Sequence, residues 1–397
     1  MAFMQHFCNR ITSKLTRLNA RSLSRANITV ENDLKKSVLI SQSTDIYTNL
    51  ALEEWIFKNF NLEKHHILML WKNDPCIVIG RNQNPWSEIN FSDLQSLKEG
   101  GVNIARRSSS GETVYHDHGN LNLTFFTPKE KYDLKKNNQV VVKSIFREFG
   151  CSVDIGMDNH LLLGKKKQVS NNAAKLGREN AYHNISLRVQ CSKINRNVAL
   201  QKRDVHIQSS TKHSVPLSEM MNLCEETPDV TVSTLVKAVG WEFLRTKGIS
   251  GKDGGMELAN KQQGFHMVNP TEYWFPGIQE IRDKYNSWEW RYGKTPKFTI
   301  AQNFAVPTGL LHTNAGASAS LKVTMTVENG RISDITIFVP QELNSLGFTG
   351  EAKVFHGLKG KKFTAQAFED LEDSLGSLLN EKDRFFTECL KQVMTNA

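Results

Sequence analysis

The stretch ARRSSSGETVYHDHGNLNLTFF, residues 105–126, decides the fold. Its first half is a loop of serine and glycine that follows two arginines, and its second half alternates polar and apolar side chains. Because side chains alternate along a strand, the polar residues of 120–126 share one face and the apolar residues share the other. The loop can bring backbone N–H groups close to an anion, although an ordinary serine-rich turn fits its composition equally well. The stretch therefore predicts a strand with one polar and one apolar face behind a polar loop.

Short strands and amphipathic helices surround this stretch on both sides. Upstream, Asp45 is placed to cap a helix that continues to Phe60, and an Asn-Asp-Pro turn at 73–75 joins two apolar strands. Downstream, helical patterns alternate with short strands. The expected strands are 36–41, 66–71, 76–79, 153–155, 161–163 and 182–189, and the expected helices are 91–100, 140–149 and 232–244. This order predicts an α/β (α+β) domain over residues 33–270.

The last third of the chain has a pattern of its own. An Asn-Gly pair at 329–330 between two alternating runs is a strong hairpin signal. The expected elements are strands 321–327 and 332–339, followed by helices 365–379 and 383–395. We therefore expect a smaller α+β accessory domain over residues 271–397.

The start of the chain differs from the rest in charge. Residues 1–30 hold five Lys or Arg and no Asp or Glu, in a chain whose net charge is +9. Apolar and basic side chains recur there at helical spacing among several serines, which is typical of a mitochondrial transit peptide. We therefore expect residues 1–32 to direct the protein to the mitochondrial matrix; a basic helix lying on a surface is the alternative. Because more than half of the excess charge is local, it is weak support for nucleic-acid binding.

The cysteines and histidines form no disulfide framework or metal-site pattern. The six cysteines are scattered without a CxxC pair, as expected for reduced thiols. His116 and His118 have the spacing of half a metal site, but no Cys, His or Asp cluster completes it, so we expect no metal. No apolar run approaches the roughly 18–20 residues of a membrane-spanning helix, so we expect no membrane span.

Seven segments of the chain occur in the order found in one enzyme family. They are NLALEEW (49–55), LWKNDPCIVIGRNQNPW (70–86), RRSSSGETVYHDHGNLNLTFF (106–126), AAKLGRENAYH (173–183), SVP (214–216), NPTE (269–272) and SWEWRYGKTPKF (287–298). In these segments the chain resembles lipoate–protein ligases and, more closely, the mitochondrial lipoyltransferases.

This resemblance implies a fold related to biotin protein ligases and class II aminoacyl-tRNA synthetases, with residues 33–270 as the catalytic domain. It implies an acyltransferase that passes a lipoyl or octanoyl group from lipoyl-AMP, or from a lipoylated donor, to a lysine. The implied acceptors are the lipoyl domains of 2-oxoacid dehydrogenase E2 subunits and the glycine-cleavage H protein. ATP and Mg²⁺ are expected only if the activation step is retained. The family-like state is a monomer without a nucleic-acid or membrane partner.

The resemblance also assigns substrate-binding residues, with a tyrosine above the acyl chain. They are Arg106, Arg107, Ser109, Gly111, Tyr115, His116, Asn120, Ser170, His183, Asn184, Ser186, Lys212 and Ser214. The pattern alone predicts that His183 is a core histidine, because it shares one face of the expected strand with apolar residues at every second position. Asn184, Ser186 and Arg188 share the opposite face, which is the better candidate for the site.

Several site positions depart from the family pattern. Gln168, the position we assign to catalysis, stands where the family has lysine, and Glu112 and Asn171 stand where it has glycine. The lysine would bond the acyl carbonyl and the phosphate, and losing such a donor typically costs about 10²–10³-fold in rate. Lys166 is two residues before Gln168 and would share its face on a strand, so Lys166, or Lys212 in a neighbouring loop, can supply the missing charge. The alternative for residues 165–167 is a solvated hairpin turn.

Three functions stay open at this point. The first is an active lipoyl or octanoyl transferase. The second is a catalytically impaired relative that binds lipoyl domains or lipoyl-AMP without turnover, as the changes at Gln168 and Glu112 would allow. The third is an RNA-binding module of synthetase-like fold, which rests only on charge and fold analogy.

Overall fold

The computed structural model describes residues 35–91, 101–200, 207–209, 219–245, 264–311, 319–343, 350–353, 357–364, 366–367 and 381–395. The predicted transit peptide, most of the predicted helices 91–100 and 365–379, and the site candidates Lys212 and Ser214 lie outside these ranges. None of the described helices is long and apolar enough to cross a membrane.

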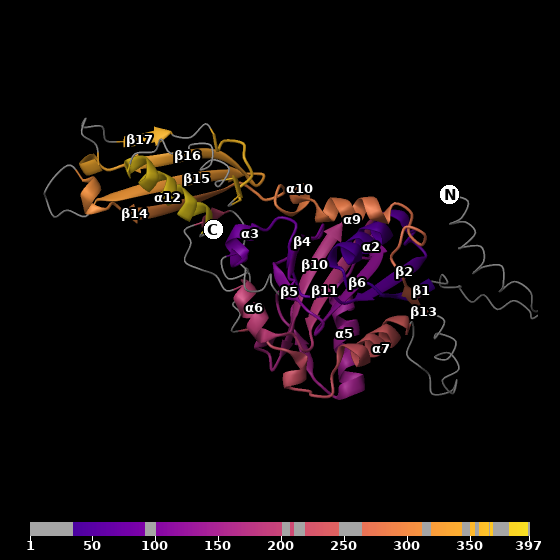
Figure 1. Ribbon diagram of the computed structural model, residues 1–397. Coiled ribbons are helices and arrows are strands. Elements are labelled where there is room, and N and C mark those ends of the chain that lie inside the picture. Colours follow the sequence, from indigo (N-terminus) through magenta and orange to yellow (C-terminus); the bar gives the residue numbers. More distant parts are fainter. Residues whose placement is uncertain are drawn as a thin grey trace, which may run out of the picture. The chain divides into compact units, whose positions relative to one another are not determined.

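A six-stranded sheet forms the centre of the larger part of the chain (Figure 1). In spatial order its strands are β10 (Ser170–Leu176), β11 (Asn180–Arg188), β6 (Asn120–Pro128), β2 (His65–Trp71), β1 (Lys35–Ser41) and β13 (Phe265–Val268). β1 runs parallel to β2 and β13, and the other neighbours are antiparallel. The strands predicted in this region are confirmed, with ends that differ by one or two residues.

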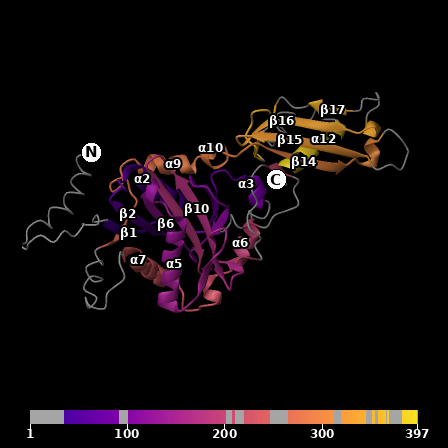
Figure 2. The ribbon, with the colours of Figure 1, turned by 180° about the vertical axis from the view of Figure 1, so that it is seen from behind.

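Each face of this sheet packs against a pair of helices (Figures 1 and 2). α2 (Ile46–Asn59) and α9 (Ile278–Asn286) pack on one face, and α5 (Leu134–Phe149) and α7 (Val232–Leu244) on the other. Alternation along β2 separates the two cores, because Met69 joins the first and Leu68 the second. The strand predicted at 120–126 is confirmed as β6, and both its polar and its apolar face are buried. Its polar side chains lie beneath α2, where Thr124 bonds a glutamate of that helix.

Two small sheets carry the loops beside the central sheet. β3 (Cys76–Ile79) pairs with β4 (Asn103–Arg106) on one side and β5 (Val114–His116) on the other. The serine-rich loop therefore connects two strands that flank the same neighbour. The second sheet is formed by β7 (Val153–Ile155), β8 (Leu161–Leu163) and β9 (Lys167–Gln168). Short helices α3 (Pro85–Glu88), α6 (Lys193–Leu200) and α10 (Trp288–Arg291) occupy connections.

A five-stranded antiparallel sheet is formed mainly by the last third of the chain. Its order is β12 (Ile207–Ser209), β14 (Phe298–Ala305), β15 (Ser320–Glu328), β16 (Arg331–Val339) and β17 (Gly350–Lys353), and α12 (Glu381–Thr395) packs on it. The predicted hairpin is confirmed: Asn329 and Gly330 have φ of 52° and 69°, as a tight primed turn requires. β12 comes from within residues 33–270 but pairs with β14. The division of the chain at residue 270 stays a prediction.

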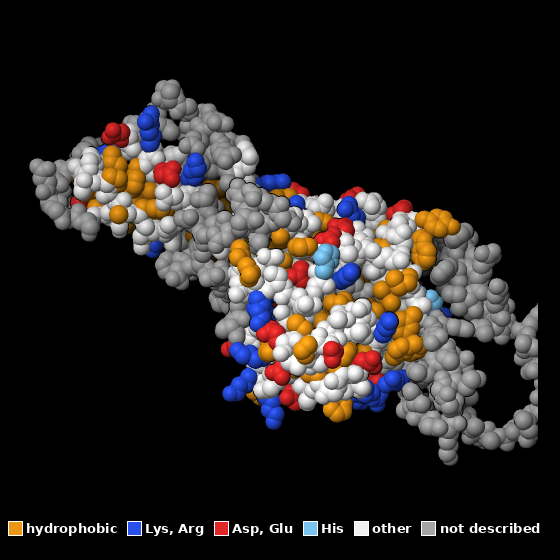
Figure 3. All heavy atoms as spheres, turned by 60° about the horizontal axis from the view of Figure 1, so that its bottom comes forward, with side chains coloured by type: hydrophobic (Ala, Val, Ile, Leu, Met, Phe, Trp, Pro, Cys, Tyr) orange, Lys and Arg blue, Asp and Glu red, His pale blue; other side chains and the backbone are white. Residues whose placement is uncertain are grey.

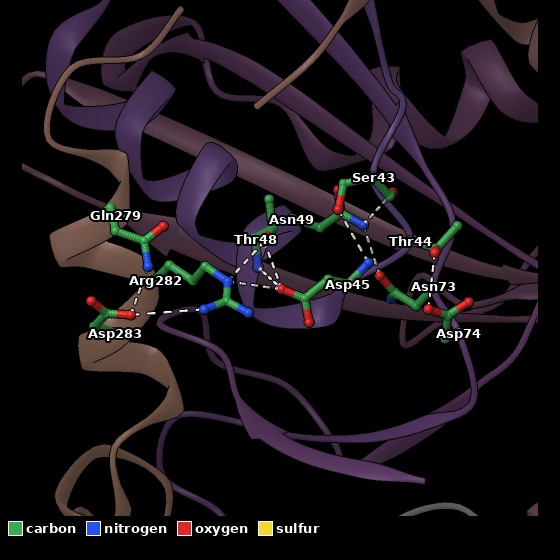
Figure 4. Close-up of polar contacts among 10 residues, drawn as sticks. All are labelled: Ser43, Thr44, Asp45, Thr48, Asn49, Asn73, Asp74, Gln279, Arg282 and Asp283. Carbon is green, nitrogen blue, oxygen red and sulfur yellow. Dashed lines mark hydrogen bonds and ion pairs between the residues drawn. The ribbon is translucent and has the colours of Figure 1, made fainter. Parts of the chain in front are cut away.

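The start of α2 is tied to two other segments (Figure 4). Asp45 caps the helix as predicted, because its Oδ2 accepts a hydrogen bond from Thr48 N at 3.0 Å. Arg282 of α9 donates from Nε to the same oxygen at 3.1 Å. The buried Asn49 amide donates to Asn73 Oδ1, which lies in the turn after β2. Asp45 therefore fixes the start of α2 against α9, and Asn49 fixes it against the β2–β3 turn.

We expect Asp45→Ala to lower the free energy of unfolding by about 1–2 kcal/mol, because it removes the cap and a half-exposed ion pair. Asp283→Ala is the matched control, since Asp283 is exposed and lies 3.7 Å from Arg282 Nη1. It should cost less than about 0.5 kcal/mol. Urea unfolding of both variants measures the difference, and equal losses would contradict a capping role for Asp45.

Candidate functional site

A narrow pocket lies beneath the buried face of α2. Its lining residues are Leu50, Glu53, Trp71, Val78, Arg107, Val114, His116, Asn171, Asn172, Ala173, Asn184 and Ser186. Apolar side chains from α2, β2, β3 and β5 form one part of the wall, and polar side chains from β5, β10, β11 and the loop after β4 form much of the rest. Of the residues assigned by the resemblance, the pocket brings together Arg107, His116, Asn184 and Ser186.

The side chains of the two adjacent arginines at the end of β4 contact different parts of the protein. Arg106 is fully buried, and its guanidinium donates to the carbonyls of Gly80, Arg81 and Gln83 and to Thr295 Oγ1. Its Nε donates to a further carbonyl of α10. Every nitrogen of the Arg106 guanidinium is thus used within the protein, and the side chain does not line the pocket. The structure therefore does not bring Arg106 to the site.

Arg107 lies at the pocket and holds the serine-rich loop in place. Its three nitrogens donate to the backbone carbonyls of Ser110, Val78 and Glu112. Gly111 has a φ of +107°, and a Cβ there would lie 2.5 Å from Asn172 O and 2.8 Å from Arg107 Nη2. The loop therefore needs glycine at 111, both for its conformation and for its close approach to β10.

A chain of buried hydrogen bonds crosses one wall of the pocket. His116 Nδ1 lies 3.1 Å from Asn73 Nδ2, and His116 Nε2 lies 2.8 Å from Ser186 Oγ. Ser186 Oγ in turn donates to Asn120 Oδ1 at 3.2 Å. Burial, together with the nearby guanidiniums of Arg107 and Arg188, lowers the pKa of His116 to about 3. His116 is therefore neutral, accepts from Asn73 and donates to Ser186, so it acts as a hydrogen-bonding group rather than a charge.

Glu53 is a pocket residue that the sequence analysis did not assign. Its Oε1 accepts a hydrogen bond from Thr124 Oγ1 at 2.8 Å, and Asn184 Nδ2 lies 3.5 Å away. Burial raises the pKa of Glu53 to about 7 against the effect of this hydrogen bond. A signal existed, because Glu53 follows Leu50 by three positions and so shares the apolar face of the helix.

The next residue, Glu54, has the opposite behaviour. Burial raises its pKa, but the ammonium groups of Lys175 and Lys58 outweigh this effect and bring the pKa below its usual value. Lys175 Nζ lies 2.5 Å from Glu54 Oε2, and Ser108 Oγ donates to the same oxygen. Glu54 is therefore an ionised anchor for the serine-rich loop and for β10.

The departures from the family pattern lie together. Glu112 Oε2 accepts a hydrogen bond from Asn171 Nδ2 at 2.6 Å, and the Asn171 oxygen accepts one from Arg188 Nη1. Arg188 Nη2 also donates to the backbone carbonyl of Gln168 at 2.7 Å. The Gln168 amide donates to Ser170 O and does not line the pocket. Its catalytic assignment stays a prediction.

Lys166 is one of the two lysines suggested as a substitute cation, and it does not lie on a strand. Lys166 lies in the turn between β8 and β9, exposed to solvent. The predicted alternative of a solvated hairpin turn is therefore confirmed for Lys166, which does not share a strand face with Gln168 because β9 begins only at Lys167.

Tyr115 also lies away from the pocket. It packs with Ile77, Ile79 and Ala199 in a separate buried cluster. Its neighbours Val114 and His116 line the pocket, so strand alternation turns Tyr115 to the other side. The placement above an acyl chain does not agree with this geometry.

The remaining assigned residues that the structure describes do not line the pocket. Ser109 is fully buried behind the loop, and Ser170 Oγ accepts from Leu161 N at 2.9 Å. His183 bonds Asn172 through Nε2 at 3.0 Å and stacks on Phe125, so it is a core histidine, as the pattern alone predicts.

The described residues contain no group of three His, Cys, Asp or Glu side chains placed to hold a metal ion. His118 is exposed and lies 3.5 Å from Asp74, whereas His116 is buried and fully bonded. On the face shown in Figure 3, basic and acidic side chains are interspersed rather than gathered by sign. That face offers no basic stripe for a nucleic acid.

Comparison with known proteins is consistent with this site. Residues 45–244 match the family model described as lipoyl protein ligase A/B catalytic domain. The mitochondrial lipoyl amidotransferase of Homo sapiens is 37% identical over 338 residues, 84% of this chain and 83% of that protein. Lipoate-protein ligase A of Bdellovibrio bacteriovorus is 30% identical over 331 residues, 81% of this chain and 89% of that protein.

A crystal structure of P. falciparum LipL1 in complex with lipoate has the same fold. Its TM-score is 0.52 at 21% identity, with coverage of 91% of this chain and 100% of that chain. Together these comparisons confirm the predicted family, the α/β (α+β) fold class and the predicted class of enzyme, an acyltransferase.

Glu53 gives the site a pH-dependent signature. Its pKa is about 7 in the folded chain and 4.5 as the unperturbed value, so the folded chain holds an extra proton between these two pH values. The contribution of Glu53 to stability is therefore fully present below pH 4.5 and lost as the pH rises through 7. We expect this loss to reach about 3 kcal/mol in the wild type and to vanish in Glu53→Gln.

Glu54→Gln is the matched control, because the pKa of Glu54 is shifted the other way. Its contribution is present above the unfolded pKa and lost as the pH falls, so this variant should lose more stability, relative to the wild type, at neutral than at acid pH. Urea unfolding from about pH 3 to pH 8 measures both, because the contribution of Glu54 is lost only below its unperturbed pKa of 4.5. Parallel pH profiles for Glu53→Gln and the wild type would show that Glu53 is not the group responsible.

Proposed function

Because the chain belongs to the lipoyl protein ligase A/B catalytic domain family, we propose that it transfers a lipoyl or octanoyl group to a lysine of an acceptor protein domain. The pocket is the observation that carries this proposal. Leu50, Trp71 and Val78 provide an apolar wall for the acyl chain, and Arg107 and Asn171 lie where a polar, anionic head group can be bound. Lipoyl-AMP, or a lipoylated donor, is the proposed source of the acyl group.

The acceptor lysine is the nucleophile in this proposal. Its amine attacks the acyl carbonyl, the new C–N bond replaces the C–O bond to the phosphate, and AMP leaves with that electron pair while the amine loses a proton. The protein orients the two reactants and stabilises charge. No cysteine lines the pocket in the described part of the chain, so the reaction is assigned no covalent intermediate on the protein.

The acceptors proposed are the lipoyl domains of 2-oxoacid dehydrogenase E2 subunits and the glycine-cleavage H protein. The mitochondrial matrix is the proposed location, supported by the acid-free, basic start of the chain and by the mitochondrial relative. ATP and Mg²⁺ belong to the reaction only if the chain also makes the adenylate. The protein is proposed to act as a monomer, without a nucleic-acid or membrane partner.

Intact-mass analysis of an acceptor lipoyl domain tests the proposal. The chain from residue 33 is incubated with the domain and lipoyl-AMP or, separately, with lipoate and ATP. We expect one lipoyl group per domain from lipoyl-AMP. Modification from lipoate and ATP would add the ligase step. Tight binding of lipoyl-AMP without any modification would contradict the transferase and leave the non-catalytic relative.

Gln168→Lys restores the family's residue and should raise the transfer rate, since a charged donor at this position is worth about 10²–10³-fold in comparable sites. The buried Gln168 must turn away from Ser170 O for the new ammonium to reach the pocket, so we expect the lower end of that range or less. Lys166→Gln is compared beside it. The exposed turn position predicts less than about a twofold change, and a large loss would restore Lys166 as the substitute cation.

A further inference from the structure

Arg188 is a buried cation that contacts no carboxylate among the residues that the structure describes. The side chain is 4% exposed on β11, and its partners are the Asn171 amide oxygen and the Gln168 carbonyl. Burial lowers the pKa of Arg188 to about 10, so the guanidinium stays charged at neutral pH. A buried charge held only by neutral groups is costly unless another anion completes its surroundings.

The guanidinium of Arg188 also has a free donor. Among the arginines at this site, the nitrogens of Arg106 and Arg107 are all bonded within the protein. Arg188 Nε, in contrast, is buried without a hydrogen-bond partner among the described residues. Asn171, which bonds Arg188 directly, lines the pocket, so this donor lies immediately behind the pocket wall.

Further unsatisfied polar atoms lie on the same side of the neighbouring strand. Asn120 and Asn122 of β6 are fully buried, and they pair with Arg188 and Ser186 in the sheet register. The Asn120 Nδ2 and both amide atoms of Asn122 have no partner within the described part of the chain. Buried polar groups are almost always satisfied, so a row of such atoms indicates a polar group that is bound there in the working protein.

We propose that Arg188 is the cation of this site and binds the phosphate of the acyl-adenylate, in the role the family pattern gives to a lysine at position 168. Asn171 holds the guanidinium in place, and the incoming phosphate competes with the Glu112 carboxylate, which is linked to this cation only through Asn171. The inference rests on the proposed function for the identity of its ligand. It accounts for three departures together, because Asn171 bonds Glu112, and Arg188 donates both to Asn171 and to the Gln168 carbonyl.

The test compares a charged with an uncharged acyl ligand. Dissociation constants for lipoyl-AMP and for lipoamide are measured with the wild type, Arg188→Gln and Arg188→Lys. Arg188→Gln should weaken lipoyl-AMP binding about 10- to 100-fold, as expected for a hydrogen bond to a charged group, and change lipoamide binding less than about twofold. Arg188→Lys should recover part of the affinity. Arg147→Gln on the exposed side of α5 is the control for the loss of one charge.

Glu112→Gln provides a variant that leaves the buried arginine intact. It should bind lipoyl-AMP several-fold more tightly than the wild type, because the competing carboxylate is gone, and the gain should disappear in the double variant with Arg188→Gln. Unchanged lipoyl-AMP affinity in Arg188→Gln, or equal losses for both ligands, would overturn the proposal, the second outcome by showing a merely structural role.

If the wild type binds neither ligand, the proposed function fails, and the anion site is tested without it. Inorganic phosphate, compared with chloride at equal ionic strength, should then raise the melting temperature of the wild type but not of Arg188→Gln. The same response in both proteins would overturn the assignment of Arg188.

Discussion

The alternation of two buried arginines at the end of one strand is the constraint on which the site depends. A buried guanidinium must find an acceptor for each of its donors, and consecutive residues on a strand point to opposite sides. Arg106 therefore fixes the loop after β3 and the segment that leads to β14, through the carbonyls of Gly80 to Gln83 and Thr295. Arg107 fixes the serine-rich loop from the other side. Two consecutive residues, Arg106 and Arg107, thus position the segment before β14 and the pocket wall.

The ionisable groups in and around the pocket differ in their protonation state. Glu54 is ionised against Lys175, and Glu53 has a pKa of about 7 because it is buried without a cation in contact. His116 is held neutral between Asn73 and Ser186. The positive charge of the wall therefore comes from arginines, of which Arg107 is occupied by carbonyls. In this account the cation that the family places on a lysine has moved to Arg188, and Glu112 is the carboxylate that balances it through Asn171.

Much of the fold follows from local patterns in the sequence. These patterns predicted β1, β2, β6 and β11 of the central sheet but not β10 or β13. Asp45 and the Asn329-Gly330 turn were identified because caps and tight turns require particular residues. The site was harder to predict, because it depends on which way a side chain points after the chain has folded. Tyr115 packs in a separate buried cluster and not at the pocket, and Lys166 lies in the turn just before β9 begins.

Glu53 was missed for a related reason: a carboxylate in an apolar helix face has meaning only once Thr124 and Asn184 are known to lie opposite. The contact between Glu112 and Asn171 is likewise a product of the fold, because 59 positions separate these residues in sequence. A resemblance shows that both depart from the family pattern, but not that they bond each other. The effect of these substitutions therefore depends on the contacts that the substituted residues make with one another in the folded protein.

A crystal structure of the wild-type chain with lipoyl-AMP tests the central claim most directly. The account predicts an acyl chain against Trp71 and Val78, a phosphate oxygen within hydrogen-bond distance of Arg188, and a Glu112 carboxylate that has left Asn171. A ligand bound with its phosphate away from Arg188, and with the Glu112–Asn171 hydrogen bond intact, would contradict it.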